Sequence, residues 1–249
     1  ITIASNVLEG YNANEINEQI KTELKNYNLP KNTSISFTGE QESQAEEMAF
    51  LSKALLIAVF FIFLILVAQF NSTSTPIIIS LTVLLSLIGV LLGLIVFRME
   101  FVIMMTMIGI ISLAGIVVNN AIVLIDYTNL VMVRKRLEEG LDEGVLTKEI
   151  INESIVEGGK TRLRPVLLTA ITTVLGLVPL AVGININFMT LFTEFDPEFY
   201  IGGENVAFWG PMSWTIIFGL TFATFLTLII VPVMYQLLNN FKFKLDRKQ

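Results

Sequence analysis

Five apolar stretches, each about twenty residues or longer, constrain this chain more than any other feature. A bilayer core of about 30 Å is crossed by about 20 helical residues. Each stretch reaches that length, and none shows the alternating pattern of a membrane barrel. We therefore expect an α-helical integral membrane protein with five transmembrane helices. The expected spans are 49–70, 76–97, 101–127, 165–184 and 211–238.

The composition excludes several classes of function. Hydrophobic residues make up 53% of the 249 residues and charged residues 15%, whereas charged residues make up about a quarter of an ordinary soluble domain. The chain has no His and no Cys, which excludes disulfides, thiolate chemistry and His-based catalysis within it. No phosphate-binding loop is visible. We expect no enzyme site, no cofactor, no bound metal ion and no nucleic-acid partner.

The distribution of Lys and Arg predicts the orientation of the spans, because cytoplasmic segments carry the excess of basic residues. Eleven basic residues lie in 128–164 and beyond residue 238, whereas the loops between spans on the opposite side contain only Arg98. We expect 128–164 and the basic tail 239–249 to be cytoplasmic. The loop 185–210 and the N-terminal part are then outside.

The N-terminal part, 1–48, has the pattern of a soluble domain. Strand-like segments at 1–4 and 34–38 flank a helix expected over 13–27, and a polar helical lead-in at 41–48 precedes the first span. We expect a small α/β remnant of a larger extracytoplasmic domain. Because the chain starts with Ile1, we also expect it to be a piece of a longer polypeptide.

Two segments between spans are patterned as well. In 128–164, apolar residues recur at helical spacing and predict an amphipathic helix on the cytoplasmic face of the membrane. The loop 185–210 is aromatic, which suits the headgroup zone. The residues of the helical pattern are Leu146, Ile150, Ile151, Ser154 and Ile155.

Two adjacent amides, Asn119 and Asn120, interrupt an apolar stretch that contains no charge. At helical spacing, Asn119 shares a face with Ser112, Gly115 and Asp126. A small, polar face of this kind predicts contact with other helices rather than with lipid. It fits either interhelical hydrogen bonds, worth about 0.6 to 2 kcal/mol, or a polar relay for protons or ions. Asn does not titrate, so a relay needs a titrating partner elsewhere.

A second polar face lies on the next span, where Arg162 shares a face with Thr169, and Thr172 and Thr173 continue toward mid-membrane. An orientation anchor explains the arginine, and hydrogen bonds to the carbonyls of the same helix explain the threonines. Two polar faces on consecutive spans can also line one path. The candidate relay residues are Asn119, Arg162 and Thr169, followed by Asn120 and Asp126.

Several motifs resemble one known family. They are "QFNSTSTPIIIS" at 69–80, "GIVVNNAIVLIDY" at 115–127, "EGGKTRLRPVLLTAITTVLGLVPLA" at 157–181 and "FATFLTLIIVPVMY" at 222–235. Their order and spacing resemble the C-terminal membrane half of resistance–nodulation–division (RND) efflux permeases, in the hydrophobe/amphiphile exporter branch. The N-terminal remnant then corresponds to the end of a periplasmic porter subdomain.

The resemblance implies a multidrug efflux antiporter of the bacterial inner membrane, driven by the proton motive force. It implies a homotrimer that works with a periplasmic adaptor protein and an outer-membrane channel, surrounded by membrane lipids. In the family, two adjacent aspartates in the N-terminal half of the permease titrate. The resemblance places Asn119, Arg162 and Thr169 on the wall opposite them.

The sequence departs from the family pattern at Asn119, where well-known drug pumps carry Lys. An amide only donates and accepts hydrogen bonds, so the charge balance is expected to differ and to depend more on Arg162. The loop 185–210 is also longer than the glycine-rich link of many pumps. The alternative of another class is a non-transporting membrane scaffold or export-assisting factor of the same architecture.

Overall fold

The structure is a computed structural model that describes residues 16, 19–20, 22–24, 35, 40–141 and 147–246. The chain divides into two compact units, Ile1–Ala49 and Phe50–Gln249. In the first unit, the described residues of the helix expected over 13–27 are helical. The strands expected at 1–4 and 34–38 lie outside the described residues, apart from residue 35.

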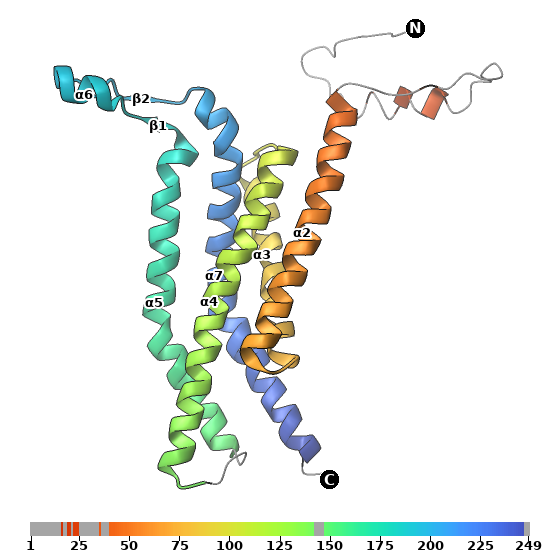
Figure 1. Cartoon of the computed structure of the whole chain (residues 1–249), viewed down its shortest axis with the longest axis vertical. Helices are drawn as coiled ribbons and strands as arrows, with labels where there is room; N and C mark the ends of the chain where they lie inside the picture. Colours follow the sequence, from red (N-terminus) through yellow and green to blue (C-terminus); the bar gives the residue numbers. More distant parts are fainter. Residues whose placement is uncertain are drawn as a thin grey trace. The chain divides into compact units, whose positions relative to one another are not determined.

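Five helices of the described chain are long and apolar enough to cross a membrane, which confirms the expected helical membrane fold (Figure 1). Long runs of Leu, Ile, Val and Phe without interior charges favour this state, because a helix satisfies all its backbone groups internally. The helices are α2 (Glu40–Phe70), α3 (Ser74–Val96), α4 (Ile103–Glu138), α5 (Lys148–Val182) and α7 (Glu204–Asp246).

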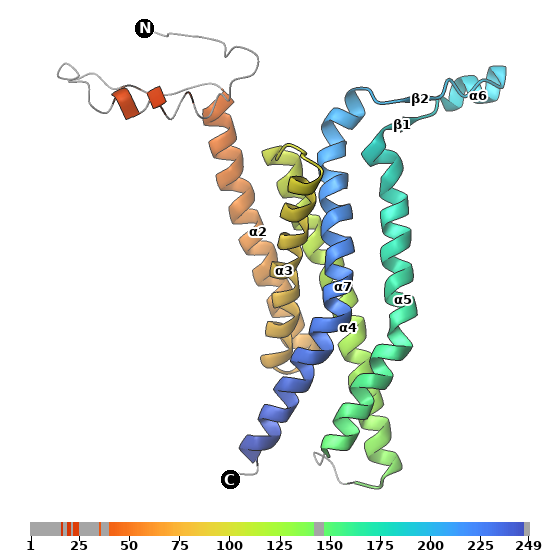
Figure 2. The ribbon, with the colours of Figure 1, turned by 180° about the vertical axis from the view of Figure 1, so that it is seen from behind.

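Helix α7 is the centre of the second unit. It packs against α3, α4 and α5, and α4 also packs against α3 and α5 (Figure 2). One buried apolar cluster includes Ile79, Ile125 and Val231, and a second includes Val90, Leu113 and Leu220. Each cluster therefore joins α3, α4 and α7 into one core.

Close helix contacts in this core depend on glycine. A Cβ added at Gly219 of α7 would lie 2.1 Å from Leu113 Cδ2 and 2.8 Å from a methyl group of Val90. A Cβ added at Gly93 of α3 would lie 2.2 Å from the ring of Phe218. Small residues allow helices to approach closely in membranes, so these two positions set the spacing of α7 against α3 and α4.

The segment 128–164 differs from its expected form as a cytoplasmic loop that holds a separate helix. α4 continues to Glu138, and α5 is unbroken from Lys148 to Val182. Thr147 caps α5, since its side chain accepts a hydrogen bond of 3.2 Å from the Ile150 amide. Pro165, expected at a helix start, lies inside α5. In this segment the residues change from apolar to charged, but neither α4 nor α5 ends at that change, because Lys, Arg and Glu have high helix propensity.

The expected apolar face in this segment exists, but its partner is protein rather than the membrane surface. Of the five residues in the predicted pattern, Ile150, Ile151, Ser154 and Ile155 are buried, and Leu146 lies outside the described residues. Ile151 and Ile155 belong to the same apolar cluster as Ile125 of α4. The apolar periodicity of this segment therefore predicted which face of α5 is buried, but it did not predict that other helices cover that face.

The connection between α5 and α7 contains two short strands and a short helix. Strand β1 (Ile184–Asn185) pairs antiparallel with β2 (Tyr200–Ile201), and α6 (Phe188–Glu194) lies between them. Helix α7 already begins at Glu204, although the sequence predicted a start at 211. The expected loop at 185–210 is thus a small folded projection from the ends of two helices (Figure 1).

Candidate functional site

Arg162 is fixed against the neighbouring helix by an aromatic ring. Its guanidinium carbon lies 4.3 Å from the centroid of the Tyr127 ring on α4. Cations at this distance from a ring face are attracted by its quadrupole. The Arg162 side chain is half-buried, and its Nε is buried with no hydrogen-bond partner among the described residues. The Arg162 guanidinium thus lies between α4 and α5, and its Nε–H remains able to donate a hydrogen bond.

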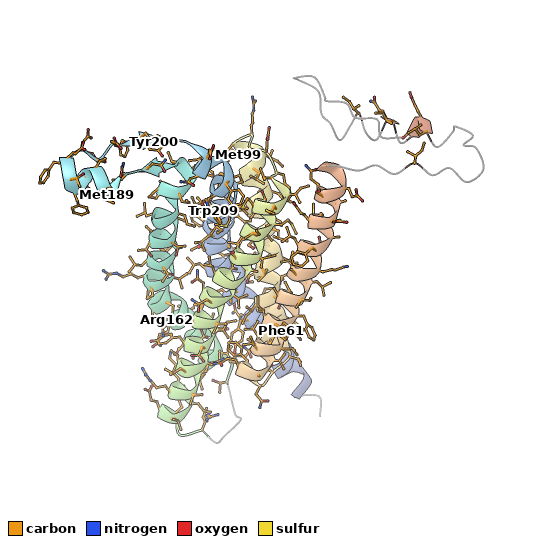
Figure 3. All side chains as sticks on the ribbon, turned by 45° about the horizontal axis from the view of Figure 1, so that its top comes forward. Phe61, Met99, Arg162, Met189, Tyr200 and Trp209 are labelled. Carbon is orange, nitrogen blue, oxygen red and sulfur yellow. The ribbon has the colours of Figure 1, made fainter. Side chains whose placement is uncertain are left out.

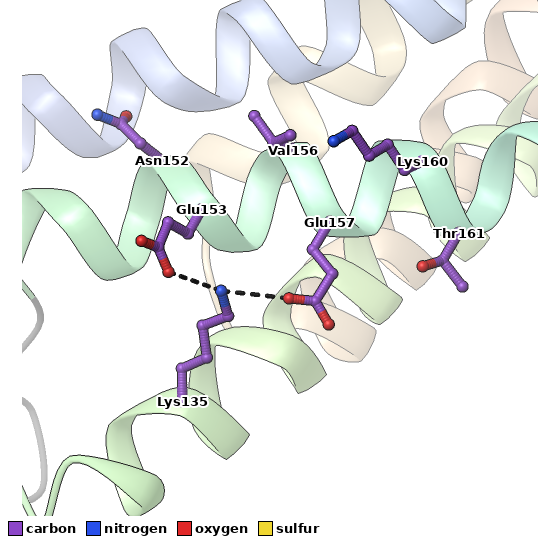
Figure 4. A pocket seen from close by; sticks show the side chains of 7 residues that line it. All are labelled: Lys135, Asn152, Glu153, Val156, Glu157, Lys160 and Thr161. Carbon is purple, nitrogen blue, oxygen red and sulfur yellow. Dashed lines mark hydrogen bonds and ion pairs between the residues drawn. The ribbon is translucent and has the colours of Figure 1, made fainter.

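Two further contacts join α4 to α5 on the side of their connecting segment. A Cβ added at Gly158 would lie 2.4 Å from Thr128 Oγ1, so the helices touch there. Lys135 Nζ pairs with Glu153 at 2.8 Å and with Glu157 at 3.2 Å (Figure 4). The pairs line an open groove together with Asn152, Val156, Lys160 and Thr161.

These contacts fix the register of α4 against α5, which run antiparallel. Asn119 lies eight residues before Tyr127, and Thr169 lies seven residues after Arg162. With a rise of about 1.5 Å per residue, Asn119 and Thr169 lie at nearly the same level. By the same reasoning, Asp126 lies level with Arg162. The structure therefore brings the candidate residues of the two helices to matching levels.

The candidate face on α4 is exposed. Ser112, Gly115, Asn119 and Asp126 are all exposed, and neither Asn119 nor Asp126 makes a side-chain hydrogen bond to another described residue. On α5, Thr169 is exposed as well. Asn120, by contrast, is only 7% exposed. The two adjacent amides therefore have different surroundings. We call Ser112, Gly115, Asn119 and Asp126 the exposed stripe of α4, and Asn120 does not belong to it.

The threonines of α5 bond to their own helix. Thr169 Oγ1 donates to the Val166 carbonyl at 2.9 Å, and Thr173 Oγ1 donates to the Thr169 carbonyl at 2.8 Å. Hydrogen bonds to the carbonyls of the same helix are one of the two explanations that the sequence offered for these threonines. Each hydroxyl keeps free acceptor lone pairs, so these bonds leave Thr169 able to accept a further hydrogen bond.

The glycines on this face have open space beside them. A Cβ added at Gly115 of α4 or at Gly176 of α5 would meet no atom within 4 Å. Gly158 and Gly219, in contrast, are closely covered by neighbouring helices. The exposed stripe thus combines polar groups with small residues, which is the composition of helix–helix interfaces in membranes.

Sequence reasoning missed several polar contacts between helices. Tyr127 was not singled out, although it holds Arg162, and Lys135 was interpreted only as a topology signal. The Tyr235 hydroxyl donates to Asn129 Oδ1 and joins α7 to α4, and Gln236 Nε2 donates to Asn152 Oδ1 at 2.8 Å. Interhelical partners cannot be found from one helix's periodicity. Within the described residues, no group of three or more Asp or Glu side chains could hold a metal ion.

Comparison with known proteins identifies the family. The sequence model of the AcrB/AcrD/AcrF family matches residues 1–239. The chain belongs to this family of RND permeases. This membership confirms the resemblance that the motifs indicated.

Individual relatives agree with the family assignment. The swarming motility protein SwrC of Bacillus subtilis is 35% identical over 233 residues, which are 94% of this chain and 19% of SwrC. The multidrug resistance protein MdtC of Erwinia tasmaniensis is 25% identical over 241 residues, covering 97% of this chain and 20% of MdtC. This RND chain thus spans about a fifth of the length of the relatives it matches.

A solved structure shares the fold. A crystal structure of a heavy metal efflux pump superimposes with a TM-score of 0.69 and 25% sequence identity, over 94% of this chain and 20% of the pump. The helical membrane fold of the chain is therefore that of an RND permease fragment.

Proposed function

We propose that the chain is part of a proton-driven antiporter that exports drugs or other amphiphiles, and that α4 and α5 form one wall of its proton pathway. One observation carries the proposal. The exposed polar stripe on α4 and the exposed Thr169 on α5 lie at matching levels, and Arg162 lies two turns before Thr169 on the same face of α5.

Lipid cannot satisfy such a stripe. Polar and ionisable side chains inside a bilayer face a protein interior or a water-filled cavity, because their exposure to hydrocarbon is costly. Gly115 on α4 and Gly176 on α5 each leave room for a closely approaching helix. Since the relatives are about five times as long as this chain, we infer that another part of the same permease covers the stripe.

The chemistry of the stripe suits a titrating partner. The guanidinium of Arg162 favours the charged form of a nearby carboxyl group, whereas removal from water favours the neutral form. Asn119 and Thr169 can hydrogen-bond to either form. We propose that Asn119, Arg162 and Thr169 orient carboxylates of the N-terminal half, with Asp126 in support. Asn120 is a weaker candidate because it is buried on another side.

The proposed substrate class is that of the multidrug relatives. MdtC is named for multidrug resistance, and the amphiphile-exporter motifs of the sequence agree with it. We further propose a multi-pass location in the bacterial inner membrane, with the N-terminal part periplasmic and the C-terminus cytoplasmic. A homotrimer with an adaptor protein and an outer-membrane channel completes the proposal. A non-transporting scaffold is not favoured, because it needs no polar groups at matching levels on two helices.

The experiment is transport by the full-length protein in proteoliposomes. A pH gradient, acid on the side of the N-terminal part, is imposed, and movement of a fluorescent amphiphilic cation is followed beside a parallel assay with a soft metal ion. The proposal expects dye export that stops when a protonophore collapses the gradient. Dye movement unaffected by the protonophore would reject proton coupling. Gradient-driven movement of the metal ion alone would reject the amphiphile assignment.

A further inference from the structure

The projection between α5 and α7 is tied together by hydrogen bonds at its base. The Gly202 amide donates to the Gly183 carbonyl at 2.9 Å, and Asn185 Nδ2 donates to the carbonyls of both glycines. Gly183 has a φ of 79°, and a Cβ there would lie 1.7 Å from a methyl group of Val206. These bonds hold β1 against β2 where the projection leaves the helices.

Hydrogen bonds also fix the start of helix α6. The Asn187 side chain caps its first turn by accepting from the Met189 amide at 3.1 Å, and Asn187 Nδ2 donates to Glu198 Oε2 at 2.7 Å. The Asn187 amide donates to the Pro197 carbonyl at 3.0 Å. The segment after α6 is therefore bonded back to its start, and the projection is a folded element.

This folded element leaves three large apolar side chains uncovered. Met189 is 75% exposed, Phe192 79% and Phe195 89%. Met189 and Phe192 are three residues apart and share one side of α6, whereas Thr190 and Thr193 share another. Such an amphipathic helix has an apolar face that requires a partner.

The end of α5 and the chain that leads to α6 also expose apolar side chains. Exposed apolar side chains follow one another from the α5 helix through β1 into α6, and Figure 3 shows Met189 and Tyr200 in the projection beyond the ends of α5 and α7. Farther along α7, Trp214 stacks on Phe218, and the Trp214 indole donates to the Ala181 carbonyl near the end of α5 at 3.0 Å. The exposed residues along this path are Leu175, Leu180, Val182, Ile184, Ile186, Met189 and Phe192.

The charges of the region leave apolar burial as the source of any membrane affinity. No Lys or Arg occurs between Arg164 and Lys242, whereas the projection contains Glu194, Asp196 and Glu198. These acids are exposed. Acids at the polar edge of an apolar helix disfavour attraction to anionic headgroups, so binding would rest on apolar area.

From these observations we propose that the projection is a membrane anchor, in which the Met189, Phe192 and Phe195 side chains lie in the headgroup–acyl boundary of the bilayer. Aromatic side chains are enriched at this depth in membrane proteins. The hydrogen-bonded base transmits the position of α6 to the ends of α5 and α7. The anchor thereby fixes how deeply these two helices sit in the bilayer.

Spin labelling of the full-length protein in phosphatidylcholine nanodiscs tests the anchor. The chain contributes no cysteine, so any in the remaining sequence are replaced first. Phe192→Cys places a label on the apolar side of α6, and the matched control Thr193→Cys places one on the other side. Met189→Cys repeats the apolar position in case one label distorts α6. Collision with oxygen, which concentrates in lipid, is compared with collision with a water-soluble nickel chelate.

The anchor predicts that labels at 192 and 189 collide at least about threefold more with oxygen, relative to nickel, than the label at 193. Adding phosphatidylglycerol should not increase this ratio. Labels at 192 and 189 that collide mainly with nickel would place the face in water. Immobilised labels that collide with neither reagent would show that the apolar side of α6 packs against protein, either in the same subunit or in another one. Either result overturns the proposal.

Discussion

The guanidinium of Arg162 on α5 lies 4.3 Å from the ring centroid of Tyr127 on α4. Tyr127 directly follows Asp126 in the chain, so the arginine and a stripe carboxylate lie at one level of neighbouring helices. A planar guanidinium stacks on an aromatic face, which an ammonium group does less well. This contact therefore fixes both the register of α4 against α5 and the position of the only Arg in the proposed relay.

Replacing the ring should reveal an energetic coupling between these two residues. Tyr127→Leu and Arg162→Gln, alone and together, should show a coupling of about 0.5 to 2 kcal/mol in a double-mutant cycle. Unfolding of the detergent-solubilised full-length protein measures it. Tyr127→Phe keeps the ring and should behave like the unchanged protein. Strictly additive effects of the two substitutions would contradict the contact.

The close approach of α7 to α4 predicts a stability difference between two glycines. Gly219→Ala puts a methyl group 2.1 Å from Leu113 Cδ2 and should destabilise the protein by about 1 to 3 kcal/mol through overpacking. Gly159→Ala on α5 is the matched control, because its Cβ would meet no atom within 4 Å. Thermal unfolding in detergent compares them, and equal midpoints would contradict the packing of α7.

The open space beside Gly176 leads to a prediction about transport. If another part of the permease packs there, Gly176→Leu should reduce transport by the full-length protein at least about tenfold, equivalent to about 1.4 kcal/mol. Leu175→Phe, at the neighbouring exposed position, adds bulk where lipid is expected and should leave transport near normal. Normal transport by Gly176→Leu would show that nothing approaches this face.

The ion pairs of Lys135 should affect stability and not transport. Lys135→Gln removes the pairing with Glu153 and Glu157. Because exposed ion pairs contribute little and are screened by salt, the unfolding temperature should fall slightly, and less at high ionic strength. Transport assays of the same variant should match the unchanged protein. A large loss of transport would place this pair in the mechanism.

The number and order of the membrane helices could be predicted from sequence because their signal is local. Twenty apolar residues specify a spanning helix whatever surrounds them. Helix ends were less predictable, since Pro165 and Pro211 lie inside α5 and α7 rather than at their starts. A proline inside a transmembrane helix is tolerated when neighbouring groups compensate for the lost hydrogen bond, and those neighbours are not visible in the local sequence.

For the candidate residues, helical spacing indicated which of them share a face of one helix but not which residues they contact. Helical spacing grouped Asn119 with Asp126 correctly, since both are exposed on α4. Spacing could not reveal that Tyr127 holds Arg162, because this contact depends on the register of two helices. The burial of Ile151 against α4 and α7, rather than on the membrane surface, has the same cause.

Substrate-coupled proton flux tests the central claim most directly. The full-length protein is reconstituted in proteoliposomes that contain a pH-sensitive dye, and proton uptake on adding substrate is recorded for Asn119→Leu and Thr169→Val. Thr221→Val is the matched control, because Thr221 bonds to its own helix carbonyl at 2.7 Å on α7. The account predicts that both stripe variants lose at least about tenfold in coupled proton flux, or about 1.4 kcal/mol, while Thr221→Val keeps it. Unchanged flux in both stripe variants would contradict the account.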